Sequence, residues 1–121
     1  MLVKLVLDGG IKSCCSVTST EVVRKGVASW LRPDDGLVVV DIQKEPWEPD
    51  DLARLAMSYF HEATYPLLYL DGTLATLGGI PHRIDLLSMI DGKIDYGIRE
   101  EDIVNAARIN GYLVEQENAA T

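Results

Sequence analysis

Three short apolar runs, each bounded by turn residues, limit most strongly what this chain can fold into. They cover residues 1–7, 37–42 and 66–70, and Asp-Gly or Pro-Asp-Asp-Gly sequences stand beside them. Runs of this length that lack polar alternation are typical of strands covered on both faces, as in parallel sheets. The pattern therefore predicts an α/β fold around a buried sheet.

Helical patterns fill the intervals between these runs. Thr18 followed three residues later by Glu21 fits a capping box and predicts a first helix that begins there. Asp50 is a good N-cap for a second helix, and Pro81 suits the first turn of a third. Residues 99–109, with acidic residues in the first turn, predict a fourth.

The third run continues into a hairpin. Asp71-Gly72 is a strong turn signal, and residues 73–77 alternate as an antiparallel return strand. The resulting order, β-α-β-α-β-β-α, resembles the thioredoxin fold. We therefore expect a thioredoxin-like domain over residues 1–93 with a four-stranded mixed sheet, and an appended C-terminal helix and tail over residues 94–121.

Charge and composition limit the kinds of partner that we expect this chain to bind. Eleven Lys and Arg against nineteen Asp and Glu give a formal charge of −8, which argues against nucleic acid and anionic membranes as partners. No apolar run reaches the length of a membrane span, and the N-terminus has no export pattern. The two adjacent cysteines cannot form a disulfide framework, so we expect reduced thiols and a cytoplasmic location.

Cys14 and Cys15 are the candidate reactive residues. They lie between the first strand and the first helix, where unpaired N–H groups and the helix dipole would stabilise a thiolate, with Lys12 adding positive charge. A thiolate serves both redox exchange and the ligation of soft metals. The alternative is that both are buried packing residues.

The two chemistries need different partners. Thiol–disulfide exchange usually uses a second cysteine, but the sequence after Cys15 reads C-x-x-T, ending at Thr18. A one-thiol mechanism would need a small thiol such as glutathione. A soft ion would be held by both cysteines, with a third ligand from a small thiol or a thiol-bearing protein.

A proline at the start of the third strand adds to this site. In a thioredoxin-like fold, Pro66 is expected to form a cis bond with Tyr65 and to face the cysteine loop, where the backbone can pair with an extended substrate. Lys12, Thr18, Tyr65 and Pro66 are therefore candidate substrate-binding residues. Without the context of this fold, the Tyr65-Pro66 pair indicates only a proline at the start of a strand.

One family resemblance is specific. The sequence Pro-Leu-Leu-Tyr-Leu-Asp-Gly at 66–72, then Gly78, Pro81, Arg83 and Leu86, resembles the ArsD arsenical-resistance family, as does Cys-Cys-Ser at 14–16. The resemblance implies a small thioredoxin-fold metallochaperone, with no permanently bound cofactor. Its cysteine thiols would bind arsenite or antimonite and pass the ion to a transport ATPase; members also act as weak repressors. The family's additional cysteine after the pair is absent here.

A second resemblance points to redox chemistry. Asp41-Ile42 followed by prolines, and Tyr65-Pro66-Leu67 before a hairpin, are similar to the YuzD-type thioredoxin-like proteins, regarded as disulfide oxidoreductases. Their C-x-x-C motif is not present here. The two resemblances together cover residues 1–91.

Three functions follow as hypotheses. The first is binding or delivery of a soft metal or metalloid through Cys14 and Cys15. The second is a monothiol oxidoreductase, and the third is a non-catalytic binding module with inaccessible thiols, so whether the protein is an enzyme stays open.

The predicted last helix carries an apolar stripe formed by Ile103, Val104 and Ala107. This stripe must be covered by the chain itself, by a partner or by a second copy in a homodimer.

Overall fold

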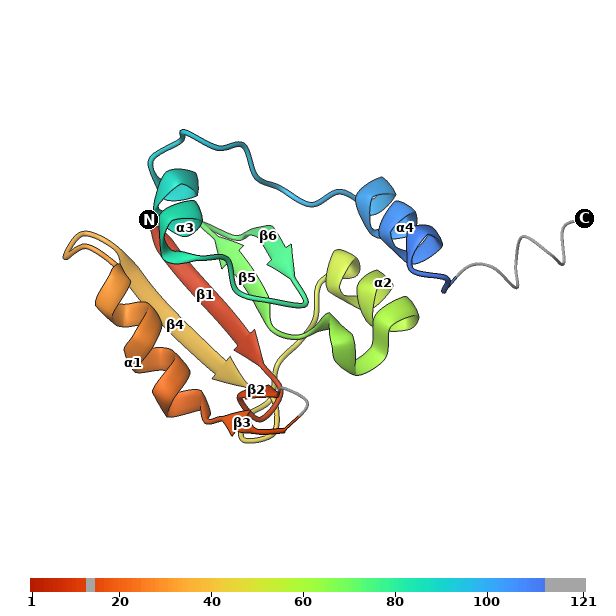
Figure 1. Cartoon of the computed structure of the whole chain (residues 1–121), viewed down its shortest axis with the longest axis horizontal. Coiled ribbons are helices and arrows are strands. Elements are labelled where there is room, and N and C mark those ends of the chain that lie inside the picture. The colour runs from red at the N-terminus through yellow and green to blue at the C-terminus, as the bar shows by residue number, and fades with distance from the viewer. Residues whose placement is uncertain (13–14, 113–121) are drawn as a thin grey trace, which may run out of the picture.

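The computed structural model describes residues 1–12 and 15–112, which form an α/β fold around a four-stranded mixed sheet (Figure 1). The strands of this sheet are β1 (Leu2–Leu7), β4 (Gly36–Asp41), β5 (Leu67–Leu70) and β6 (Thr73–Leu77), in the spatial order β4-β1-β5-β6. The helices are α1 (Thr20–Trp30), α2 (Asp51–Phe60), α3 (Arg83–Ile90) and α4 (Glu100–Ile109), and a 3-10 turn η1 (His61–Thr64) follows α2. The α/β class and the mixed sheet are confirmed.

Strand β1 lies between a parallel and an antiparallel neighbour. It pairs with β4 in parallel, from Leu2 opposite Gly36 to Leu7 opposite Asp41, and with β5 in the antiparallel direction. Helix α1 makes the crossover that parallel neighbours require. β5 and β6 form the predicted hairpin, in which both turn residues have positive φ, as a type I′ turn demands.

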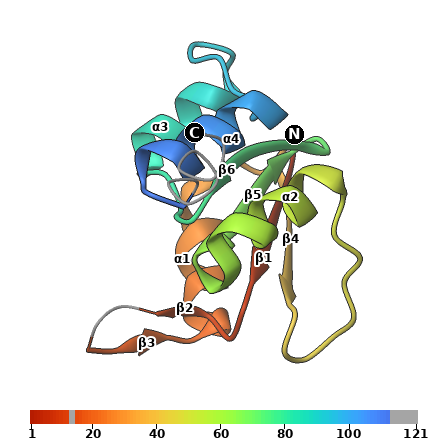
Figure 2. The same ribbon diagram turned by 90° about the vertical axis from the view of Figure 1, so that its right-hand side faces the viewer.

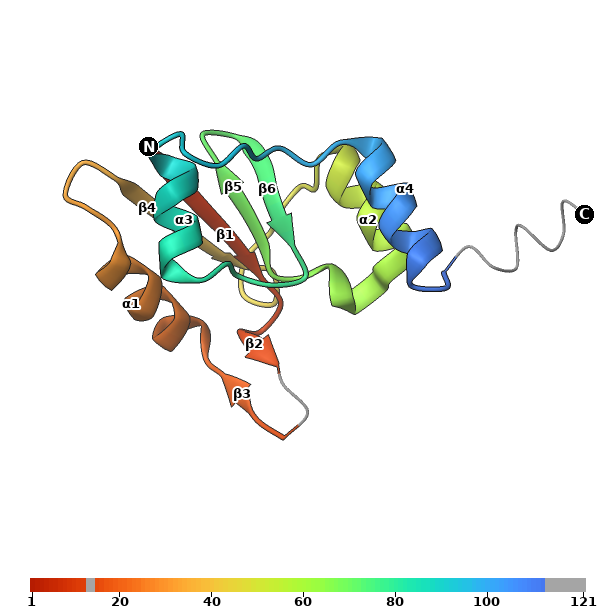
Figure 3. The ribbon, with the colours of Figure 1, turned by 45° about the horizontal axis from the view of Figure 1, so that its top comes forward.

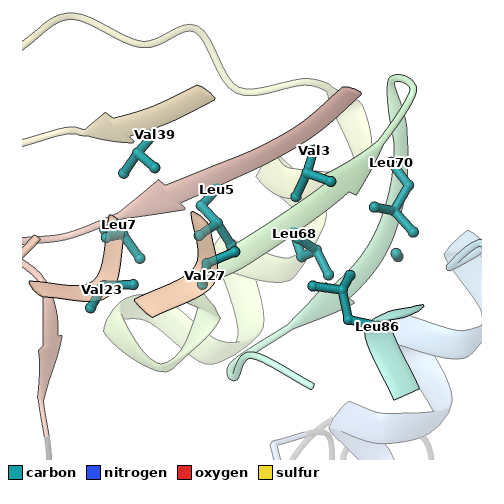
Figure 4. Packing of buried hydrophobic residues seen from close by; sticks show 10 residues of the cluster. Val3, Leu5, Leu7, Val23, Val27, Val39, Leu68, Leu70 and Leu86 are labelled. Atoms are coloured by element: carbon teal, nitrogen blue, oxygen red, sulfur yellow. The ribbon is translucent and has the colours of Figure 1, made fainter. Parts of the chain in front are cut away.

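Both faces of the sheet are covered, which explains the apolar strand sequences. Figure 2 shows α1 and α3 on one side of the sheet and the segment 42–50 on the other. On the first side, Val23 and Val27 of α1 and Leu86 of α3 pack on the sheet (Figure 4). On the other, Ala53 of α2 and the partly buried Trp47 pack on it.

Helix α4 packs against α2. Ile103 and Ala107 are buried against Ala56 and Phe60, and α4 runs beside α2 in Figure 3. The backbone N–H of Ile98 donates to the carbonyl of Leu74, 2.8 Å away, which ties the preceding segment to the sheet. The buried part of the apolar stripe is therefore covered by the chain itself.

This packing can be tested with two substitutions in one helix. Ile103 is 1% exposed and Ile109 is 83% exposed. Ile103→Asp places an unpaired charge between α2 and α4, so we expect α4 to detach and limited proteolysis to cut within residues 94–99. Ile109→Asp should leave the digestion pattern of the wild type unchanged. Equal protection of both variants would contradict the packing.

The segment expected to be a plain loop forms a small hairpin. β2 (Ile11–Lys12) pairs antiparallel with β3 (Val17–Thr18), with Ile11 opposite Thr18. Gly10 permits this because its φ is 96° and a Cβ there would collide with the Thr18 carbonyl oxygen. The sequence missed the hairpin because two-residue strands carry almost no periodicity.

Two expected helix starts are wrong. The N-cap of α1 is Ser19, whose hydroxyl accepts a hydrogen bond from the Val22 N–H at 3.3 Å, and not Thr18, which is taken up by β3. Similarly, α3 begins at Arg83, after Pro81. The predicted Asp50 cap of α2 is confirmed, with a 2.9 Å bond from the Ala53 N–H.

Candidate functional site

Cys15 lies on the connection between β2 and β3 and is exposed. Figure 2 shows this hairpin projecting from the sheet and helices. Cys14 falls outside the residues that the structure describes. The accessibility of the two thiols, on which the binding-module hypothesis depends, is therefore described for Cys15 alone.

Cys15 lies in the chain between β1 and α1, where the cysteine pair was expected, but it does not directly precede the helix. β3 and Ser19 stand between Cys15 and the first helical residue, Thr20. The hydroxyl of Ser19 caps the helix in the place where a thiolate was expected to benefit from the N–H groups. The physical reason is the hairpin, whose second strand, β3, lies in the chain between Cys15 and the helix and pairs Val17 with Lys12.

The Tyr65–Pro66 peptide bond is cis and lies where η1 passes into β5. Pro66 is buried, and Tyr65 is half-buried with its ring edge-on to Trp47 at a centroid distance of 6.2 Å. The Tyr65 hydroxyl lies 3.5 Å from the Met57 sulfur. Burial raises the pKa of the Tyr65 hydroxyl, and the negative charge of Asp8 raises it further. Tyr65 is thus a neutral, fixed wall residue.

A cleft of about 490 Å³ lies between the base of the hairpin and this cis bond. Its walls come from β2, the end of η1, the cis bond and the connection from β6 to α3. The lining residues are Asp8, Gly10, Ile11, Lys12, Glu62, Ala63, Tyr65, Pro66, Gly78, Gly79 and Ile80. Three predicted site residues, Lys12, Tyr65 and Pro66, therefore share one cleft.

Two predicted site residues do not line this cleft. Thr18 lines a separate, mainly apolar groove of about 460 Å³ beside α1, with Val23, Val27 and Trp30 among its neighbours. Cys15 lines neither hollow and belongs to the part of the hairpin beyond Lys12. Of the two cysteines, only Cys15 lies within the described residues, and it is not among the residues that line the cleft beside the cis proline.

Asp41 at the end of β4 fixes the base of the hairpin, a role that the sequence reading missed. Its carboxylate accepts hydrogen bonds from the Gly9 N–H at 3.0 Å, the Gln43 N–H at 3.0 Å and the Thr20 hydroxyl at 2.7 Å. Burial favours the neutral acid, but these hydrogen bonds and the charge of Lys44 outweigh it and lower the pKa of Asp41. The signal in the sequence that could have revealed this role is an Asp at the end of one predicted parallel strand and Gly9-Gly10 just after the end of its neighbour.

The turn beneath the cis bond is held by backbone contacts. The Gly78 N–H donates to the Thr64 carbonyl at 2.9 Å, and Gly78 has a φ of 75° that suits glycine. Thr64 is fully buried, and its hydroxyl has no hydrogen-bond partner among residues 1–12 and 15–112. The cleft wall is therefore set by main-chain geometry, which explains the need for Gly78.

Two absences concern only the described part of the chain. There, no three His, Cys, Asp or Glu side chains converge so as to hold a metal ion. None of the helices formed by these residues has the length and apolar character needed to cross a bilayer.

Comparison with known proteins adds no relative. A scan against protein-family models, a search of curated proteins and a search of solved structures each find no match to this chain.

Proposed function

We propose that this thioredoxin-like protein binds a soft metal or metalloid ion, such as arsenite or antimonite, through the thiolates of Cys14 and Cys15. The observation that carries the proposal is the exposed position of Cys15 on a hairpin, separated from α1 by β3. Redox cysteines are usually activated by a helix N-terminus or a nearby cation. Metal-binding thiols need less activation, because the ion itself displaces the proton.

The thioredoxin-like part of the proposal rests on connectivity. The main elements follow the order β1-α1-β4-α2-β5-β6-α3, and the third strand of this series begins after a cis proline. The short hairpin and α4 are additions to that series. The resemblance of residues 66–72 and 14–16 to the ArsD family supports the same assignment.

The chemistry requires no redox step. Each cysteine thiol replaces one hydroxyl group of arsenous acid: an As–S bond forms, an As–O bond breaks, and the thiol proton leaves with the hydroxyl as water. Two cysteines would leave one hydroxyl on arsenic, which a small thiol or a thiol of a partner protein replaces in the same way. Arsenic stays in its trivalent state throughout.

Delivery follows from the same exchange. A receiving protein with its own thiols, such as a transport ATPase, takes the ion when its S–H groups replace the cysteines one at a time. Because Cys15 is exposed and lies outside the cleft, an attacking thiol can approach it without opening the core. The site thus suits a carrier that releases its ion by contact.

Arsenite titration of the reduced protein tests the proposal. We expect saturable binding of one ion per chain, seen as a mass increase under native conditions and as protection of the thiols from alkylation. Cys14→Ser and Cys15→Ser should each abolish saturation, because one thiolate holds trivalent arsenic poorly. Ser16→Ala, in the same loop, is the matched control and should bind as the wild type does. Unchanged binding in both cysteine variants would refute the proposal.

A second candidate, a monothiol oxidoreductase, is favoured by Lys12, a cation that lies three residues before Cys15 and lines the cleft beside the cis proline. The Cys15 thiolate would attack the glutathione sulfur of a protein–glutathione disulfide, forming a Cys15–glutathione bond and releasing the protein thiol. A second glutathione would then release Cys15 and leave as glutathione disulfide. Turnover of such a mixed disulfide, lost in Cys15→Ser and without arsenite saturation, would establish this function in place of the first.

A further inference from the structure

The apolar groove of about 460 Å³ beside α1 extends to the start of α3. Val23 and Val27, which pack on the sheet in Figure 4, line it from α1, and Trp30 lines it further along the same helix. Ile80 and Pro81 line it from the segment before α3. Sites for small molecules are usually concave and mostly apolar, with volumes of about 300–1,000 Å³. The groove therefore has the size and character of such a site.

Gly26 keeps the groove open on the side of α1. A glycine inside a helix is less favourable than an alanine. The packing does not require a glycine here, because a Cβ on Gly26 would meet no atom of another segment within 4 Å. Gly26 does line the groove, so a larger side chain at this position would take up part of its volume. The glycine thus leaves room for a ligand where alanine would favour the helix.

The charge in the groove is positive. Among the described residues that line it, one is charged, Arg83, the first residue of α3. Its guanidinium has no ion pair within residues 1–12 and 15–112. The N-cap of α3, His82, also lines the groove and makes no side-chain hydrogen bond to the helix. An unpaired guanidinium and an uncapped first turn both favour an anion.

The charged residues within two positions of the lining in the sequence do not cancel this charge. Two ion pairs neutralise themselves, namely Arg24–Glu21 at 3.3 Å and Arg32–Asp91 at 2.6 Å. Lys12 and Lys25 add two positive charges, and Asp85 adds one negative charge. Asp85 is two residues from Arg83 in α3, and residues at this spacing do not face each other on a helix. Cations therefore exceed acids around the groove, although the whole chain carries a formal charge of −8.

We infer that this groove binds a small carboxylic acid with an unbranched apolar chain, of the medium-chain fatty acid class. The apolar chain lies along α1, and the carboxylate pairs with the Arg83 guanidinium. From Val23 to Trp30 the helix rises about 10 Å, at about 1.5 Å per residue. An extended chain of about eight carbons has a similar length, since each C–C bond is about 1.5 Å long. The inference is independent of the thiol chemistry proposed above, because Cys15 does not line the groove.

Titration of the protein with octanoate tests the inference. Trp30 lines the groove and Trp47 does not, so the indole N–H signal of Trp30 in NMR spectra is the local reporter. We expect this signal to shift until it saturates, while the Trp47 signal stays in place. Octanol has the same chain without the charge and should bind at least about tenfold more weakly. No saturation with octanoate, or octanol binding as tight as that of octanoate, would overturn the inference.

Substitution of Arg83 tests the role of charge. Arg83→Gln should weaken octanoate binding about tenfold or more and leave octanol binding unchanged, because octanol has no carboxylate to pair with the guanidinium. Arg24→Gln removes the same charge from an exposed position outside the lining, so octanoate should bind this variant as it binds the wild type. Equal weakening in the two variants would show that the groove does not hold the carboxylate.

Substitution of Gly26 tests the role of shape. Gly26→Leu should abolish the binding of both octanoate and octanol, because its side chain occupies the groove. The melting temperature should be at least that of the wild type, since leucine favours a helix more than glycine does. Ala28→Leu, at an exposed position of α1 outside the lining, is the matched control and should bind octanoate normally. Octanoate binding that survives Gly26→Leu, or that is lost equally in Ala28→Leu, would overturn the inference.

Discussion

Leu5→Ala is expected to lower the free energy of unfolding by about 2–5 kcal/mol, the range for buried leucine truncation. Leu5 is fully buried on the central strand β1, in the cluster that α1 and α3 cover. Removing its side chain takes apolar contacts from the sheet and from Val27 and leaves a cavity that two paired neighbouring strands cannot close. Denaturant unfolding followed by circular dichroism measures the change.

Leu2→Ala provides the control on the same strand. Leu2 is about half exposed and lies where β1 begins, so we expect a loss below about 1 kcal/mol. A Leu5→Ala variant as stable as Leu2→Ala would mean that the sheet is not packed as described. Both leucines belong to the run at residues 1–7, so the comparison separates position from residue type.

Asp41→Asn is expected to cost about 2 kcal/mol or more at neutral pH, since a buried carboxylate with three hydrogen bonds is replaced by an amide whose NH₂ opposes those donors. The hairpin base should loosen as well, because Gly9 and Thr20 lose their common acceptor. Faster hydrogen exchange at Gly9 and at Gln43 would report this local effect.

The pH dependence of this loss has a defined sign. The pKa of Asp41 is lower in the folded protein than in the unfolded chain, so its stabilisation is complete above the unfolded pKa and disappears as pH falls through the folded one. The gap between wild type and Asp41→Asn should therefore be constant above about pH 5 and shrink below about pH 4. Asp34→Asn, an exposed turn substitution, should stay within about 0.5 kcal/mol. A gap that widens in acid would contradict the assigned role.

The candidate site could be predicted only in part. Cys14, Cys15, Lys12 and the Tyr65-Pro66 pair were identified as residues, because cysteine chemistry and strand-start prolines have local signatures. The arrangement of these residues in space was not predicted. Thr18 was assigned to a helix cap and to the site, yet it pairs with Ile11 in a hairpin and lines a different groove. The role of Asp41 depends on Gly9, a contact between two strands distant in sequence.

The sequence by itself determined the class of fold and most of its elements. Apolar runs between turn residues specify buried strands, and Asp50 and Asp71-Gly72 specify a cap and a turn, because each of these signals acts over a few residues. Only the tertiary structure decided that Cys15 lies on a hairpin whose strand β3 separates it from α1, that α2 covers α4, and that β4 lies at the edge of the sheet. These features arise from packing and hydrogen bonding between distant segments, which no local pattern encodes.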